Sequence, residues 1–235
     1  MSVAADDPRI GRGMRAQLAL RRTLLADGRR PIGWKVGFGA PAWLEKLAIT
    51  GPLVGFLTDG GLVSSGETVS LAGWRKPVAE PEIAVHMGRE LGPGADAETA
   101  RAAVAAIGPA IELADLDPPP DDVEAILSGN IYHRHVIVGP TDAARAGARL
   151  DGVSARVRRN GVEIEVPANL ETNTGPLLGL VGHVADVLAS HGERLSAGDV
   201  IIAGSIVPPL FLEGGDREIA YELDPAGAVS VRFTS

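Results

Sequence analysis

Alternation of apolar and polar positions dominates this chain after residue 31 and predicts a strand-rich core. The apolar runs are short and are separated by glycine and proline, a pattern typical of strands. They predict strands at residues 32–38, 53–57, 78–87, 109–115, 134–138, 199–207, 217–223 and 227–233. Apolar residues three and four positions apart instead predict helices at residues 13–27, 96–107 and 176–190.

The segment RVRRNGVEIEV predicts a β-hairpin. Its Asn-Gly dipeptide, at residues 160–161, lies between two alternating runs and favours a two-residue turn. Counting outward from this turn pairs Arg158 with Glu163. The next pair would be Arg156 with Glu165, so both hairpin glutamates are expected to have basic partners.

Length and charge limit the organisation of the chain and its partners. A chain of 235 residues, without internal repeats or a long linker, is too short for two ordinary catalytic domains. We expect a helical segment over residues 1–30 and a single domain over residues 31–235 that carries any catalysis. A net charge of -8 without a lysine or arginine cluster argues against nucleic acid and anionic membranes as partners.

The absence of cysteine narrows the chemistry further. It excludes disulfides, thiolate zinc sites and a cysteine nucleophile, so any metal must be bound by oxygen or imidazole. The first residues do not show a basic stretch followed by an apolar run, and the longest apolar stretch, residues 200–212, is interrupted by glycine and proline. We therefore expect a cytoplasmic protein that does not span a membrane.

The segment VAEPEIAVHMG places two carboxylates two positions apart in a predicted strand. Glu80 and Glu82 therefore share one face of the strand, with their Cα atoms roughly 7 Å apart. At this spacing both carboxylates could bind one cation. They have no basic partner close in sequence. Glu112 adds a carboxylate inside the apolar run GPAIELAD, where an unpaired charge is costly. Three such groups would suit Mg²⁺ or Mn²⁺, although a solvated strand face explains a lone Glu-x-Glu pair more simply.

A lysine stands on a face otherwise made of glycine in the segment IGWKVGFG. Alternation places Lys35 on the same face as Gly33, Gly37 and Gly39, which would let a ligand approach the backbone. In that position Lys35 could stabilise negative charge or transfer protons. The alternative is an exposed lysine whose aliphatic stem packs on the surface.

Other polar residues are weaker candidates. His133 and His135 lie at the start of a predicted strand and could line a pocket, and the turn at Gly204 with the hydroxyl of Ser205 could donate hydrogen bonds to a ligand. The sequence contains no Gly-x-Ser-x-Gly elbow, Walker motif or dinucleotide-binding glycine pattern. Serine-hydrolase, nucleotide-hydrolase and NAD-dependent functions therefore have no support.

Six segments, taken in order, resemble one enzyme family. They are GWKVG at 33–37, EPE at 80–82, GPAIELAD at 108–115, GN at 129–130, NTGPLLGLVGHVADVL at 173–188 and AGDVIIAGS at 197–205. The chain resembles the 2-keto-4-pentenoate hydratase/2-oxohepta-3-ene-1,7-dioate hydratase family of the fumarylacetoacetate hydrolase superfamily. The resemblance implies an α+β fold with a mixed β-roll of the fumarylacetoacetate hydrolase C-terminal type and a helical N-terminal segment. It also implies a homo-oligomer and bound Mg²⁺ or Mn²⁺.

The resemblance assigns roles to the acidic residues and the lysine. Glu80, Glu82 and Glu112 match the metal ligands of the family, and Lys35 matches its active-site lysine. Asp59 resembles a further acidic catalytic position.

Substrate contacts follow from the same resemblance. Asn130, Asp115 and Ser205 match positions that line or support the pocket. A substrate with a second carboxylate would need a basic group, for which Arg134 and Arg75 are the candidates.

The implied reaction is hydration of a 2-hydroxy-2,4-dienoate of the 2-keto-4-pentenoate type to a 4-hydroxy-2-oxo acid, in the catabolism of aromatic compounds. Leu53, in GPLVG, departs from the acidic residue usual in similar hydratases. Two other enzymes of the superfamily remain alternatives: a 2-oxo acid decarboxylase of the 4-oxalocrotonate type, and an acylpyruvate hydrolase with Glu45 as a possible base. An inactive partner subunit of a decarboxylase or hydratase is a third alternative.

Overall fold

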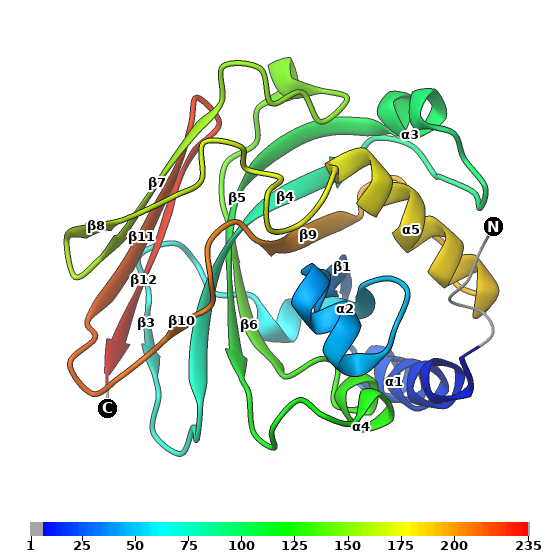
Figure 1. The fold of residues 1–235 in the computed structure, drawn as a ribbon, viewed down its shortest axis with the longest axis horizontal. Helices are drawn as coiled ribbons and strands as arrows, with labels where there is room; N and C mark the ends of the chain where they lie inside the picture. Colours follow the sequence, from blue (N-terminus) through cyan, green and yellow to red (C-terminus); the bar gives the residue numbers. More distant parts are fainter. Residues whose placement is uncertain (1–6, 235) are drawn as a thin grey trace.

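Two β-sheets and a small group of helices make up residues 7–234, the part of the chain that this computed structural model describes (Figure 1). The larger sheet has the strand order β2-β1-β9-β4-β5-β6, and β10 pairs with β4 outside this order. Its strands are β1 (Pro31–Gly37), β2 (Leu53–Thr58), β4 (Pro77–Met87), β5 (Val104–Asp115), β6 (His133–Val138), β9 (Val200–Ser205) and β10 (Leu210–Phe211). The mixed α+β class predicted from the sequence is confirmed.

The smaller sheet packs one face against the larger sheet, at the left in Figure 1. Its strand order is β3-β12-β11-β7-β8. Alternate residues of β11 are buried, so this sheet has one core face and one more exposed face. The strands are β3 (Thr68–Ser70), β7 (Ser154–Arg159), β8 (Val162–Ile164), β11 (Glu218–Asp224) and β12 (Gly227–Thr234).

The hairpin predicted from Asn-Gly is confirmed as β7 and β8, and Arg158 forms an ion pair with Glu163 at 3.1 Å. The second predicted pair is wrong. Strand β8 ends at Ile164, and Arg156 lies directly opposite Glu222 of β11, to which it donates at 3.0 and 3.1 Å. The partner of Arg156 is therefore Glu222 on a neighbouring strand, and not Glu165, which counting from the turn predicted.

The longer helices lie mainly at the right of Figure 1. Helix α1 begins at Pro8, where the Asp7 side chain accepts a hydrogen bond from the Arg9 amide and caps the first turn. In the part of the chain that is described, no helix has the length and apolar character of a membrane crossing. The helices are α1 (Pro8–Ala26), α2 (Pro41–Leu47), α3 (Ala97–Ala103), α4 (Val123–Ser128) and α5 (Leu177–Ser190), with short 3₁₀ turns η1 (Asp59–Gly61) and η2 (Ala143–Arg145).

Several element boundaries differ from the prediction. The helix predicted at residues 96–107 ends at Ala103, because the alanine-rich segment that follows pairs with β4 from Val104 onward. Pairing with a neighbouring strand here overrides the helix propensity of alanine. Helices α2 and α4 and strand β3 were not predicted, since each is too short to show a clear period.

The larger sheet curls until its two edges approach each other. Just after β2, Val63 donates a backbone hydrogen bond to the carbonyl of Val136 in β6, at 3.0 Å. Strong curling of this kind converts one face of a sheet into an interior. Apolar side chains from five of the strands fill one part of this concave interior: Leu57, Ala84, Ala110, Val136, Val200 and Ile202.

Candidate metal centre

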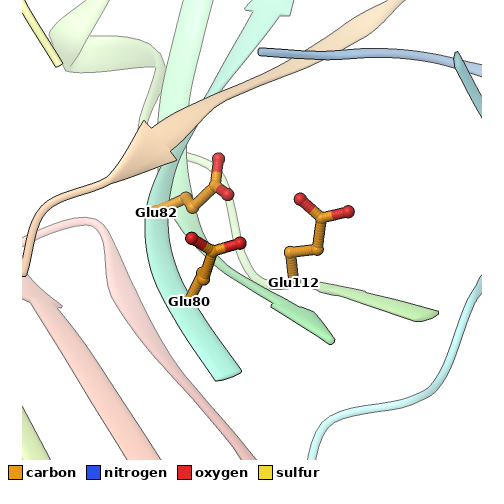
Figure 2. Close-up of side chains that lie close together, drawn as sticks. All are labelled: Glu80, Glu82 and Glu112. Atoms are coloured by element: carbon orange, nitrogen blue, oxygen red, sulfur yellow. The ribbon is translucent and has the colours of Figure 1, made fainter. Parts of the chain in front are cut away.

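Three carboxylates meet on the concave face of the curled sheet. The antiparallel register of β4 and β5 places Glu80 directly opposite Glu112, and Glu82 follows two positions along on the same face. One oxygen from each carboxylate lies within 4.8 Å of the others, and the three side chains point toward a common space (Figure 2). The alternation predicted that Glu80 and Glu82 share a face, and the strand register adds Glu112.

Burial makes the negative charge of the three carboxylates costly when no cation is bound. Glu82 and Glu112 are each 1% exposed and Glu80 is half-buried. Removal from water, followed by repulsion from Glu112, raises the pKa of Glu80 to about 7. The pKa of Glu82 rises well above its usual value for the same reasons, with Glu80 adding to the repulsion. Oxygen ligands with unbalanced negative charge suit a hard divalent cation, so these residues fit Mg²⁺ or Mn²⁺.

Lys35 provides the one ammonium group in contact with the cluster among the described residues. Its Nζ donates to Oε1 of Glu112 and, at 3.1 Å, to the carbonyl of Ile131. At 2% exposure Lys35 is not the surface lysine of the alternative interpretation. Strand β2 allows this burial through Gly55, where a Cβ atom would lie 2.8 Å from Cγ of Lys35.

His133 contacts the same carboxylate as Lys35. Its Nδ1 lies 2.7 Å from Oε1 of Glu112. Burial alone would raise the pKa of Glu112, but the charge of Lys35 and the hydrogen bond with His133 together lower it. His135 instead stacks on the ring of Trp74, with ring centroids 5.9 Å apart. The sequence offered both histidines as weak candidates. Both lie in β6, and the β5–β6 register shifts between Leu113 and Ala114, their partners on β5.

The second glutamate of β4 is held by the backbone of β9. The amide of Gly204 donates to Oε2 of Glu82 at 2.6 Å, and the φ of Gly204, +91°, lies in the region that favours glycine. Ser205 is the cross-strand partner of Glu82 and lines the cavity above the carboxylates. The structure thus places residues 204–205 at the site, as the sequence suggested.

A cavity of about 380 Å³ opens above the carboxylates, a size typical of sites for small molecules. Lys35 and the three glutamates line it together with Ser205. Sequence reasoning missed most of the remaining wall, which comes from the segment around α2, the residue before β6, the segment before α5, the connection between β9 and β10, and β10 itself. These residues include Phe38, Trp43, Tyr132, Asn173, Thr174, Val207, Pro208, Pro209 and Phe211.

Three predicted site residues do not line this cavity. Asn130 exchanges two hydrogen bonds with the backbone of Phe56, at 2.9 and 3.0 Å, and so fixes β2 rather than a ligand. Asp59 accepts from the backbone amide and Nε of Arg30, both at 2.9 Å, and ties the end of β2 to the start of β1. The hydrogen bond from the backbone amide, followed by that from the Arg30 side chain, lowers the pKa of Asp59.

Arg134, the third of these residues, is also placed outside the cavity. Its exposed side chain reaches Asp115 at 3.4 Å and lies over Trp74. The other basic candidate, Arg75, pairs with Asp117 at 2.8 Å. Asp115 is buried and accepts from the backbone amides of residues 75 and 76, so it supports the loop before β4.

Leu53, which the sequence marks as a departure from the resembled family, is buried in β2. It lies opposite Gly37 of β1 and belongs to the main hydrophobic core. Glu45, the possible hydrolase base, is exposed on α2 and does not line the cavity. Neither residue therefore adds an acid or base to the carboxylate cluster.

Comparisons with known proteins agree with this geometry. The model of the fumarylacetoacetate (FAA) hydrolase C-terminal family matches residues 44–234. The chain is 29% identical to a 4-oxalocrotonate decarboxylase of Pseudomonas putida over 220 residues, which cover 92% of this chain and 83% of the relative. It is 28% identical to a 2-hydroxyhexa-2,4-dienoate hydratase of Comamonas testosteroni over 222 residues, covering 92% and 83%.

A solved structure extends the likeness to three dimensions. The 4-oxalocrotonate decarboxylase from Pseudomonas putida G7, complexed with magnesium and adipate, matches with a TM-score of 0.87 and 27% sequence identity. The match covers 96% of this chain and 86% of that chain.

Proposed function

The chain belongs to the fumarylacetoacetate hydrolase C-terminal family, and we propose that it is a metal-dependent hydratase of 2-hydroxy-2,4-dienoates. The reaction adds one water and gives a 4-hydroxy-2-oxo acid. The observation that carries the proposal is the cluster of three carboxylates beside a buried lysine at the base of a cavity. Similarity to a dienoate hydratase along most of the chain supports it.

Glu80, Glu82 and Glu112 are the proposed metal ligands. A divalent cation bound there would act as a Lewis acid toward the carboxylate and 2-oxygen of the substrate. Oxygen ligands favour Mg²⁺ or Mn²⁺, and the magnesium complex of a related decarboxylase supports Mg²⁺. The cluster comes from one chain, so an expected homo-oligomer would not be needed to complete it.

Lys35 is the proposed proton-transfer group. Its ammonium lines the cavity and is directed by Glu112 and the carbonyl of Ile131, so its protons are held at the base where the substrate head group would lie. When the 2-hydroxyl becomes a 2-oxo group, it releases one proton and C5 of the diene gains one. Water then adds its hydroxyl to C4 and its other proton to C3, and Lys35 assists these transfers.

Decarboxylation of a 4-oxalocrotonate-type acid is the second candidate. Similarity to decarboxylases in sequence and structure favours it, and it would use the same carboxylates and the same lysine. Acylpyruvate hydrolysis has less support, because Glu45 lies outside the cavity.

Product analysis separates these candidates. Mg²⁺-loaded protein is mixed with freshly generated 2-hydroxypenta-2,4-dienoate or with 4-oxalocrotonate, and loss of the conjugated chromophore, CO₂ release and product mass are followed. The proposal predicts loss of the dienol with a gain of one water, and incorporation of ¹⁸O at C4 in H₂¹⁸O. An unreacted dienol together with CO₂ release from 4-oxalocrotonate would replace hydration by decarboxylation.

A further inference from the structure

We infer that the outer part of the cavity is an apolar subsite that selects substrates with an uncharged hydrocarbon tail over dicarboxylic acids. The inference rests on the proposed function, because it takes the carboxylate cluster as the binding site of the 2-oxo acid head group. It concerns the opposite end of the same ligand.

The charged groups of the cavity are confined to its base. Within residues 7–234, the lysine, arginine, histidine and carboxylic acid side chains that line it are Lys35 and the three glutamates. Lys35 is already paired with Glu112. One ammonium and one divalent cation would balance the three carboxylates, so no positive charge remains for a second carboxylate on the substrate.

Aromatic side chains form the outer wall on the α2 side. The ring of Phe38 meets Trp43 edge to face, with centroids 5.0 Å apart, and meets Tyr132 in the same way at 6.4 Å. All three rings are half-buried, as is Glu80, whereas Glu82 and Glu112 are almost inaccessible, so the rings are more open to solvent than two of the three carboxylates. Contact with these rings would favour a tail of carbon and hydrogen.

The wall on the β9–β10 side has the same character. Pro208, Pro209 and Phe211 line the cavity, and Phe211 is 43% exposed. Strand β10 pairs with β4 on the stretch Val78–Ala79, immediately before Glu80, so Phe211 is anchored to the same strand as two of the carboxylates. The wall and the proposed metal ligands therefore keep a fixed spacing.

Two lysines lie over rings of the wall without lining the cavity themselves. Nζ of Lys46 lies 4.6 Å from the ring centroid of Trp43, and Nζ of Lys76 lies 5.0 Å from that of Phe211. Both lysines are exposed and neither lines the cavity. A carboxylate at the end of a substrate tail would lose water against aromatic rings without gaining an ion pair.

The test measures binding rather than turnover, so that it can fail independently of the proposed reaction. Pyruvate, 2-oxohexanoate and 2-oxohexanedioate are titrated into Mg²⁺-loaded protein by calorimetry. The two longer probes have the same number of carbon atoms and differ in the second carboxylate. We expect 2-oxohexanoate to bind at least about tenfold more tightly than 2-oxohexanedioate.

Variants locate the selectivity in the wall. Trp43→Ala and Phe211→Ala should weaken the binding of 2-oxohexanoate and leave the binding of pyruvate unchanged. Unchanged binding of pyruvate also shows that the variants are folded. Phe211→Arg should strengthen 2-oxohexanedioate. Lys76→Met tests whether Lys76 turns into the cavity to bind a second carboxylate. It should not change the ratio of the affinities for the two longer probes.

Two results would overturn the inference in distinguishable ways. If pyruvate binds but 2-oxohexanedioate binds as tightly as 2-oxohexanoate, the apolar subsite is wrong and the proposed head-group site stands. If none of the three acids binds to the metal-loaded protein, the head-group site and the proposed function fail together.

Discussion

At the scale of single residues, Glu112 is the point where two basic side chains meet. Lys35 comes from β1 and His133 from the start of β6, and both contact the same oxygen, Oε1. The other carboxylate oxygen of Glu112, Oε2, contacts neither Lys35 nor His133. Lys35 and His133 thus orient a proposed metal ligand. Replacing Lys35 tests proton transfer, and replacing His133 tests metal binding.

Replacing Lys35 tests proton transfer. Lys35→Met keeps the length of the side chain but removes the ammonium, so turnover of the dienol should fall by about 10²–10⁴ in kcat. Affinity for Mg²⁺ should not fall, because a positive charge that competes for Glu112 is lost. Lys46→Met, at an exposed position, is the matched control, and an unchanged kcat for Lys35→Met would remove the lysine from the mechanism.

Replacing His133 tests the positioning of the ligand. His133→Leu removes the hydrogen bond to Glu112, and loss of such a supporting partner typically lowers metal affinity by about 10–100-fold. His133→Asn offers an amide donor and should recover part of this loss. His135→Leu is the control, since His135 stacks on Trp74 away from the cluster. Equal affinities in both leucine variants would show that His133 has no positioning role.

At the scale of elements, the strands were largely predictable and their partners were not. Alternation placed Glu80 and Glu82 on one face and identified the Asn-Gly hairpin, because both depend on neighbours in sequence. The pairing of Glu80 with Glu112 depends on the β4–β5 register, and that of Arg156 with Glu222 depends on strand order. Long-range pairing also explains why the alanine-rich run after Ala103 is a strand.

The predicted site residues that lie outside the cavity show the same limit. Asn130 and Asp59 are close in sequence to strands that form the site, but their hydrogen bonds join backbone segments instead of lining the cavity. The aromatic wall was missed because Phe38, Tyr132 and Phe211 come from separate loops and strands. Their meeting depends on the curl of the sheet, which no local pattern reports.

The close approach of β1 and β2 gives a prediction at this scale. In Gly55→Ala, the new Cβ would lie 2.8 Å from Cγ of Lys35 and 2.9 Å from Oδ1 of Asn130, both buried. The free energy of unfolding should fall by about 1–3 kcal/mol, as is usual for overpacking, and turnover should fall with it. Urea unfolding measures the first effect.

Gly182→Ala in α5 is the matched control for this substitution. Beyond its chain neighbours and the backbone of its own helix, no atom lies within 4 Å of the added Cβ, so the same change in side chain should be neutral or stabilise by up to about 1 kcal/mol. If Gly55→Ala proved as stable as the control, β2 would have room to move and the tight packing around Lys35 would be incorrect.

At the scale of the whole molecule, curling gathers acidic groups from β4 and β5 and a lysine from β1 into one interior. Strands β9 and β4 lie between β1 and β5 in the sheet, yet Lys35 and Glu112 are in contact. Apolar residues fill one part of the interior and the carboxylates occupy another. The fold therefore keeps these charges away from water, where a bound cation would interact with them strongly.

The dependence of stability on pH follows from this burial. Burial, with repulsion from Glu112, raises the pKa of Glu80 from an ordinary 4.5 to about 7 in the metal-free protein. Its protonated form is favoured by folding, so metal-free protein should lose stability as pH rises from about 4.5 to about 7. Mg²⁺ must displace that proton and should bind more weakly below about pH 7.

The corresponding measurement is the melting temperature with and without Mg²⁺ at several pH values. The increase caused by Mg²⁺ should be larger at pH 8 than at pH 6, and EDTA should abolish it. In Glu82→Gln, Mg²⁺ should raise the melting temperature only slightly at both pH values. An increase that does not vary with pH in the unsubstituted protein would contradict proton displacement from the cluster.

Counting bound Mn²⁺ by electron paramagnetic resonance tests whether Glu80, Glu82 and Glu112 bind one divalent cation. The unsubstituted protein should bind one Mn²⁺ tightly per chain, and Glu82→Gln and Glu112→Gln should each lose this site. Glu163→Gln, in the hairpin ion pair with Arg158, should keep it. Binding that is absent from the unsubstituted protein, or equal in all of these proteins, would show that the three carboxylates do not form a metal site.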